Sequence, residues 1–249
     1  MKPTVWTREP SDEAIVIVAL DVSASMWATD LYPNRMEAAK AAAQLFVQTL
    51  PEKMRVGVVS FSETSYLNQV PTTNRDDIQK ALAKLQPRSG TAIGNGLLTS
   101  LDALYGGMGG ELPLTSRGEY APAVIVLLTD GENTDGPPPL EIVPQAVEHG
   151  VRVYTIGVGT PNATTVQVGS AMLRARLDEE TLQEIARVTD AKYYNASNEQ
   201  DLRAVYEKLT TQLVTRLQPQ DISFLFTAAA FFFGALAMMF SIVWSTRLP

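Results

Sequence analysis

One aspartate and two serines follow the first strongly apolar segment of the chain, and together they could bind a metal ion. The run Ile15–Leu20 is apolar throughout, and directly after it come Asp21, Ser23 and Ser25. A strand that ends in this way projects side chains from the carboxyl edge of a sheet, where open α/β folds bind their ligands. One carboxylate and two hydroxyls at alternate positions can converge from one loop. Such hard oxygen ligands suit Mg²⁺ or Mn²⁺ rather than zinc.

Two further polar segments give this metal interpretation its specificity, because a short Asp-x-Ser-x-Ser string also recurs by chance. Thr91 lies in a Ser-Gly-Thr loop, and Asp130 follows the apolar run Val124–Leu128. In a doubly wound sheet, the loops that follow three of the strands meet at one edge. We therefore expect a single cation to be surrounded by five residues, which are Asp21, Ser23, Ser25, Thr91 and Asp130.

This ligand set would leave a bound cation short of negative charge. Mg²⁺ requires near-octahedral oxygen coordination and tends to keep water ligands. The three hydroxyls are neutral, and the two aspartates supply charge either directly or through water. A carboxylate of another protein could fill the remaining position through a charge-assisted bond. Mg²⁺ is the expected ion, with Mn²⁺ or Ca²⁺ as alternatives, although Ca²⁺ prefers more carboxylates.

Apolar runs alternate with helical patterns along the chain, which predicts an α/β fold with a doubly wound, mostly parallel sheet flanked by helices. The expected strands are residues 15–20, 55–61, 65–70 (at an edge), 124–128, 151–158 and 192–194. The expected helices are residues 35–50, 76–85, 93–104, 140–148, 178–188 and 199–217. Residues 106–120 are a Gly-rich connection, and residues 160–171 are an insertion compatible with a hairpin.

A long apolar run near the C-terminus predicts one transmembrane helix. Residues 222–244 carry no charge, and about 20 apolar residues suffice to cross a bilayer as a helix. Trp244 would lie near one interface, and Arg247 follows it. The expected organisation is therefore a lead-in over residues 1–13, an α/β domain over 14–217 and a transmembrane helix over 221–246. Because no signal peptide is visible at the N-terminus, we expect either a tail anchor or a further upstream part.

The composition excludes several classes of function. The 249 residues, 45% of them hydrophobic, suffice for one sizeable α/β core. A net charge of −7 without a dense Lys/Arg patch argues against a nucleic-acid partner. The chain has no cysteine and a single histidine, His149, which excludes thiolate catalysis and a His-rich zinc site. No glycine-rich nucleotide motif is matched, and we assign no catalytic residue.

Five stretches of the chain resemble a known family. They are LDVSASMWATDLYPNRMEAAK, SGTAIGNGL, VIVLLTDGENTDG, VRVYTIGVGT and LDEETLQEIARVTDAKYY. The set is similar to von Willebrand factor A domains with a metal-ion-dependent adhesion site, and in detail to bacterial membrane-bound members of the Bat (aerotolerance) type. The resemblance covers about residues 15–215 and implies a Rossmann-like fold. It also implies that Ser23, Ser25 and Thr91 are direct ligands, and that Asp21 and Asp130 are acidic ligands often acting through water.

The resemblance implies a membrane-anchored, metal-dependent protein-interaction module and not an enzyme. Mg²⁺ would bridge the site to an Asp or Glu of a partner, and the residues expected at the rim are Trp27 and Asp30. Relatives of this type are often associated with other membrane proteins and with MoxR-type AAA+ ATPases, in assembly or stress tolerance. We expect the inner (plasma) membrane, a single C-terminal span and an extracytoplasmic domain. Basic residues before the span, such as Lys208 and Arg216, favour the opposite orientation.

Two other functions are compatible with the sequence. The chain could be a structural subunit of a larger membrane complex with an incidental metal, which a metal-independent partner interaction would favour. It could also be a Mg²⁺-dependent hydrolase. Metal-assisted hydrolysis needs an activated water and usually a nearby general base, and the sequence has no second dense acidic cluster.

Overall fold

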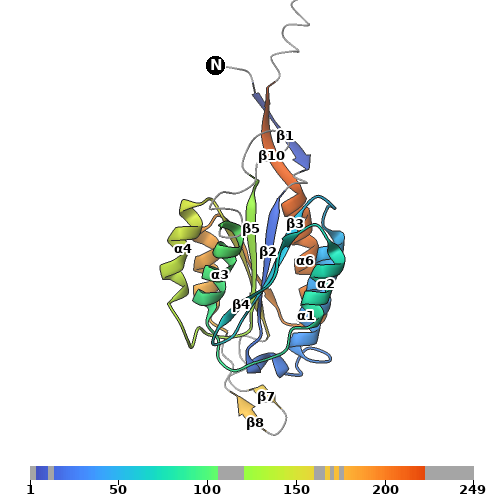
Figure 1. Cartoon of the computed structure of the whole chain (residues 1–249). Coiled ribbons are helices and arrows are strands. Elements are labelled where there is room, and N and C mark those ends of the chain that lie inside the picture. The colour runs from blue at the N-terminus through green and yellow to red at the C-terminus, as the bar shows by residue number, and fades with distance from the viewer. Residues whose placement is uncertain are drawn as a thin grey trace, which may run out of the picture. The chain divides into compact units, whose positions relative to one another are not determined.

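The apolar runs form a six-stranded, mostly parallel sheet (Figure 1). Its strands lie in the order β4 (Ser65–Thr72), β3 (Arg55–Phe61), β2 (Ile15–Asp21), β5 (Ala123–Thr129), β6 (Arg152–Val158) and β9 (Tyr193–Ala196). The edge strand β4 pairs antiparallel with β3, and the other neighbouring pairs are parallel. The computed structural model describes residues 4–10, 14–105, 121–159, 166–168, 171–173 and 177–221.

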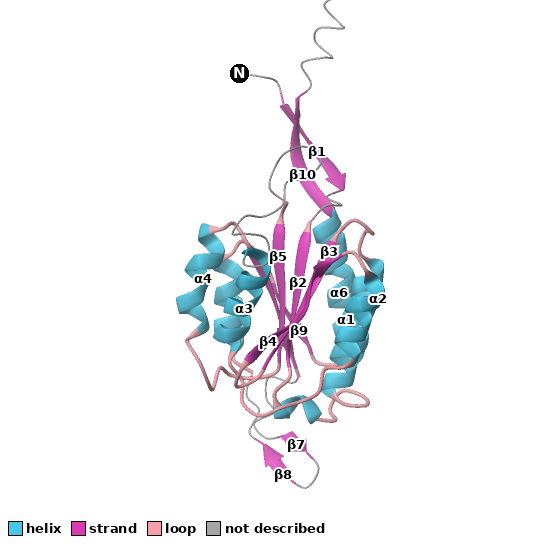
Figure 2. Ribbon diagram, in the orientation of Figure 1, coloured by secondary structure: helices cyan, strands magenta, loops and turns pink. Residues whose placement is uncertain are grey.

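Helices cover both faces of this sheet (Figure 2). On one face lie α1 (Arg35–Thr49), α2 (Arg75–Ala83) and α6 (Glu199–Val214). On the other face lie α3 (Ile93–Tyr105), α4 (Pro139–Glu148) and α5 (Glu179–Val188). Successive side chains of a strand point to opposite faces, so a strand covered on both sides must be apolar throughout. This requirement explains the unbroken apolar runs of β2 and β5. The observed arrangement confirms the predicted α/β sheet with flanking helices.

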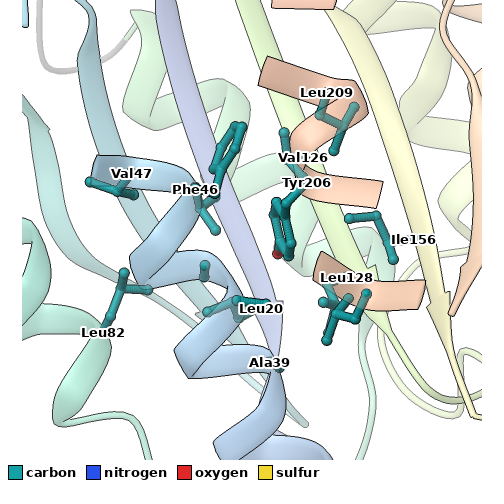
Figure 3. Close-up of a cluster of buried hydrophobic side chains, with 14 of the residues drawn as sticks. Leu20, Ala39, Phe46, Val47, Leu82, Val126, Leu128, Ile156, Tyr206 and Leu209 are labelled. Carbon is teal, nitrogen blue, oxygen red and sulfur yellow. The ribbon is translucent and has the colours of Figure 1, made fainter. Parts of the chain in front are cut away.

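The core between the sheet and α1 and α6 holds β2 and β5 in place (Figure 3). Phe46 of α1 packs on Tyr206 of α6, with ring centroids 5.0 Å apart. Leu20 and Leu128 reach into the same cluster from the C-terminal ends of β2 and β5. Residues that immediately follow these two strands are therefore attached to a closely packed and rigid layer.

Most predicted helices begin and end within two residues of the observed ones. Local capping explains this agreement. The Asn34 side chain accepts a hydrogen bond from the backbone N–H of Glu37 (2.8 Å) and begins α1, and Pro51 follows its end. The predicted insertion over residues 160–171 overlaps an antiparallel pair of short strands, β7 (Val166–Val168) and β8 (Ala171–Leu173), and β8 continues two residues beyond it.

A second unit pairs the two ends of the described chain. Strand β1 (Thr4–Pro10) pairs antiparallel with β10 (Thr215–Asp221), and this pair forms a unit separate from the domain that contains the six-stranded sheet. The sequence pattern predicted that the last helix continues to Leu217, whereas α6 ends at Val214. Pro219 cannot donate the backbone hydrogen bond that a helix interior requires, and β1 supplies a partner for an extended segment instead.

The predicted membrane helix over residues 221–246 and the Gly-rich connection over residues 106–120 lie outside the described ranges, except for residue 221 at the end of β10. Within those ranges, none of the helices combines the length and the apolar character needed to span a bilayer.

Candidate metal centre

The predicted ligands lie where the strand order of the sheet reverses. From β2 the chain first adds β3 on one side and later adds β5 on the other, so the loops after β2 and β5 diverge at this point. Ligands of open α/β sheets bind at such a position, outside the carboxyl ends of the strands. Asp21 is the last residue of β2, and Asp130 directly follows β5. The two aspartates are therefore brought to one edge by the pairing of their strands.

Two serine hydroxyls converge on one aspartate at this edge. The short helix η1 (Ala24–Trp27) turns the chain after Ser23, and it places the Oγ atoms of Ser23 and Ser25 2.9 Å apart. Both hydroxyls donate to Oδ1 of Asp130, Ser25 at 2.6 Å and Ser23 at 3.4 Å. Ser23, Ser25 and Asp130, three of the five predicted ligands, are thus in direct contact. In the sequence, the two serines precede Asp130 by more than a hundred residues.

Asp21 shapes the loop that carries the serines. Its Oδ1 accepts a hydrogen bond from the backbone N–H of Ser23 (2.7 Å), and its Oδ2 accepts one from the hydroxyl of Thr129 (2.5 Å). The side chain is fully buried. Burial, together with the neighbouring carboxylate of Asp130, raises the pKa of Asp21 to about 7.

Hydrogen bonds between two loops hold Thr91 beside the turn that carries Asp130. The carbonyl of Thr91 accepts hydrogen bonds from the backbone N–H groups of Thr134 (2.8 Å) and Asp135 (3.1 Å). A Cβ atom placed on Gly131 would lie 4.0 Å from Oγ1 of Thr91, so the threonine hydroxyl lies beside the turn that begins at Asp130. On the other side, the backbone of Arg88 pairs with that of Ser23, which joins the Thr91 loop to the serine loop.

Two residues of this centre were not predicted from the sequence. Thr129 binds Asp21 as described above, and Arg35 donates from Nη1 to Oδ2 of Asp130 (2.9 Å). Burial raises the pKa of Asp130, and the guanidinium of Arg35 opposes that rise. An arginine at the first position of a helix is usually solvated, so the sequence carries no signal that marks this one. Asn133 has a structural role, because its Oδ1 accepts the backbone N–H of Ile93 (2.7 Å) at the start of α3.

The two predicted rim residues differ in their surroundings. Trp27 follows Ser25 by two residues on η1 and is 45% exposed. The carboxylate of Asp30 accepts two hydrogen bonds from Arg35, from Nε and from Nη2, both at 2.7 Å. Tyr32, nearby in the chain, is 83% exposed. Partner contact by Trp27 and Asp30 stays a prediction.

The chemistry of this centre fits a hard divalent cation. Its potential ligands are carboxylate and hydroxyl oxygens alone, which Mg²⁺ and Mn²⁺ prefer. In the described part of the chain, no three His, Cys, Asp or Glu side chains gather closely enough to hold a metal. The two carboxylates are buried beside each other, and a divalent ion would compensate the charge that burial makes unfavourable.

Comparisons with known proteins agree with this fold. Residues 16–132 match the von Willebrand factor type A domain, a span that includes all five predicted ligands. A UPF0353 protein of Mycolicibacterium paratuberculosis is 34% identical to this chain. The alignment covers 99% of this chain and 74% of that protein. The chain therefore belongs to the UPF0353 family.

Solved structures confirm the resemblance to Bat proteins. The crystal structure of the conserved hypothetical protein BatB from Bacteroides thetaiotaomicron superimposes with a TM-score of 0.65 at 27% identity, covering 80% of this chain and 98% of that one. Proximal thread matrix protein 1 from the mussel byssus has the same fold, with a TM-score of 0.63 at 22% identity. The superposition covers 82% of this chain and 48% of that one. That mussel protein is described with a zinc-occupied MIDAS motif.

Replacing one serine hydroxyl tests the metal site. We expect Ser23→Ala to weaken Mn²⁺ binding about 10- to 100-fold, because a coordinating oxygen is lost from a set that contains few charges. Isothermal titration calorimetry on the full chain measures the effect. The control is Ser100→Ala, which removes another buried hydroxyl that bonds within α3, to the carbonyl of Gly96. Equal affinities of Ser23→Ala and wild type would refute the assignment.

The raised pKa of Asp21 predicts that metal affinity depends on pH. Below about pH 7 the metal-free protein holds a proton on Asp21, and a cation must displace it. Affinity for Mn²⁺ should therefore fall about tenfold for each pH unit below this value, and it should level off above it. Titrations between about pH 5.5 and 8.5, in buffers of different ionisation enthalpy, measure both the affinity and the released proton. An affinity that is constant over this range would contradict the prediction.

Proposed function

We propose that this protein is a metal-dependent protein-interaction module in which Mg²⁺ links the domain to a carboxylate of a partner. The observation that carries the proposal is the convergence of the Ser23 and Ser25 hydroxyls on Asp130 at the carboxyl edge of the sheet. The match of residues 16–132 to the von Willebrand factor type A domain supports it. In this proposal Ser23, Ser25 and Thr91 are direct ligands, and Asp21 and Asp130 complete the set.

A partner carboxylate suits this centre because the proposed direct ligands are neutral. An Mg²⁺ ion held by hydroxyl oxygens retains much of its positive charge, and it attracts an anionic ligand to its open position. Trp27 is an exposed aromatic side chain next to the serine loop, and exposed tryptophans often anchor protein interfaces. We infer a partner that presents an Asp or Glu with an apolar neighbour able to pack on Trp27.

An interaction role fits the centre better than hydrolysis does. Metal-assisted hydrolysis requires a base that can accept a proton from the metal-bound water. Both carboxylates of the site are already engaged by hydroxyl, amide or guanidinium donors, namely Asp21 by Ser23 and Thr129, and Asp130 by Ser25 and Arg35. The arrangement therefore favours holding a cation over activating a water.

We further propose that residues 221–246 anchor the domain in the plasma membrane and that the domain lies on the extracytoplasmic side. The uncharged run over residues 222–244 supports the anchor. The likeness to BatB supports the Bat-type interpretation, and a setting among other membrane proteins, in a complex linked to a MoxR-type ATPase, is an extension of this proposal. In this orientation the ATPase acts on the domain through a membrane-spanning partner.

The interaction proposal predicts partners that are retained only with metal. Wild type, Ser23→Ala and Ser100→Ala are used to capture proteins from detergent-solubilised native membranes, with Mg²⁺ or with EDTA. We expect a partner that is captured by wild type and Ser100→Ala in Mg²⁺, and lost with EDTA or with Ser23→Ala. Substitution of acidic residues in that partner should then abolish capture. A partner retained in all conditions would instead favour a structural subunit with an incidental metal.

The proposed orientation predicts a cytoplasmic C-terminus. Fusions of a fluorescent protein and of alkaline phosphatase to Pro249 distinguish the two sides of the membrane. We expect fluorescence without phosphatase activity. Phosphatase activity without fluorescence would place the tail outside and contradict the extracytoplasmic domain.

A further inference from the structure

Arg35 contacts the metal centre although it supplies no oxygen ligand. Its guanidinium lies between two carboxylates, donating to Oδ2 of Asp130 from Nη1 (2.9 Å) and to both oxygens of Asp30 from Nε and Nη2 (2.7 Å each). The Arg35 side chain is 2% exposed and that of Asp130 is 0% exposed. The Arg35–Asp130 pair is thus shielded from water, whereas Asp30 is in partial contact with solvent at 29%.

The end of β6 leaves space for this guanidinium. Gly159 has a φ of +111°, which L-residues rarely adopt, and a Cβ atom there would lie 2.7 Å from Nη2 and 2.8 Å from Cζ of Arg35. Any side chain at this position would therefore displace the guanidinium. Three separate segments fix Arg35, namely the loop with Asp30, the turn with Asp130 and the glycine after β6.

The position of Arg35 matters because of the charges beside it. Asp21 and Asp130 are both buried, and they lie close enough for the charge of one to affect the other. A guanidinium stays charged in proteins, and a buried carboxylate that loses its cationic partner strongly destabilises the fold. When no divalent ion is bound, Arg35 supplies positive charge to this pair.

We propose that Arg35 is the resident counter-cation of the metal centre, which keeps Asp130 and the serine loop in their ligand arrangement while no divalent ion is bound. Asp30 and Gly159 are positioning residues for Arg35 in this account. The inference rests on the proposed metal-binding function. As a consequence, Arg35 and a bound cation stabilise the same carboxylates. The loss of one therefore increases the stabilisation that the other provides.

Thermal unfolding of four forms of the full chain, each in EDTA and in saturating Mn²⁺, tests this role. The forms are wild type, Arg35→Gln, Asp130→Asn and the double variant. In EDTA we expect Arg35→Gln to lower the midpoint by about 10 °C, because Asp130 loses its partner. The double variant should recover most of that loss, because it no longer contains the uncompensated carboxylate. Mn²⁺ should raise the midpoint of Arg35→Gln more than that of wild type.

Lys40→Gln is the matched control, since Lys40 is another buried cation of α1. It pairs with Glu37 (2.9 Å) and donates to the carbonyl of Leu85, neither of which is a proposed ligand. The Mn²⁺-induced shift of Lys40→Gln should equal that of wild type. The proposal is overturned if the double variant is no more stable than Arg35→Gln, or if Mn²⁺ stabilises Arg35→Gln no more than wild type.

Two further outcomes are also decisive. If Arg35→Gln does not fold in EDTA, recovery by Mn²⁺ or by Asp130→Asn supports the proposal, and failure of both overturns it. If Mn²⁺ does not stabilise wild type, the proposed metal function is wrong. The metal-free comparison of the single and double variants then still decides whether Arg35 compensates Asp130.

Discussion

The burial of two carboxylates at one edge of a parallel sheet is the constraint on which the rest of this structure depends. Asp21 ends β2 and Asp130 directly follows the adjacent strand β5, and hydrogen-bond pairing of the two strands brings both residues together away from water. An ionised carboxylate in such surroundings must find compensation in hydrogen bonds, a cation or a proton. The Ser23 amide and the hydroxyls of the serines and Thr129 supply hydrogen bonds, and the guanidinium of Arg35 supplies a cation.

The fold explains how such a site can be both buried and open to a ligand. Apolar strands covered on both faces give a rigid base, and the ligand loops extend beyond it at the carboxyl edge. Helix η1 turns the serine loop over this edge and leaves Trp27 exposed beside it. A cation placed there would have the packed sheet behind it and solvent, or a partner, in front of it.

Much of the fold was predictable because its signals are local. Unbroken apolar runs indicated strands such as β2 and β5, and caps such as Asn34 set helix boundaries. The proposed ligands could be placed at one edge from the sequence, because strand ends of an α/β fold meet there. Arg35 and Thr129 were missed because their roles depend on contacts with residues distant in the chain. The same reason explains β10, whose partner β1 lies at the other end of the sequence.

The central claim is that the hydroxyls of Ser23, Ser25 and Thr91 hold a divalent cation at the edge between β2 and β5. Anomalous diffraction from crystals of the protein grown with Mn²⁺ tests this claim most directly, because it locates the ion without reference to any partner or activity. The account predicts an anomalous peak within coordination distance, about 2.0–2.3 Å, of these three hydroxyl oxygens. A well-ordered site without such a peak at millimolar Mn²⁺, or an ion bound by other residues, would contradict it.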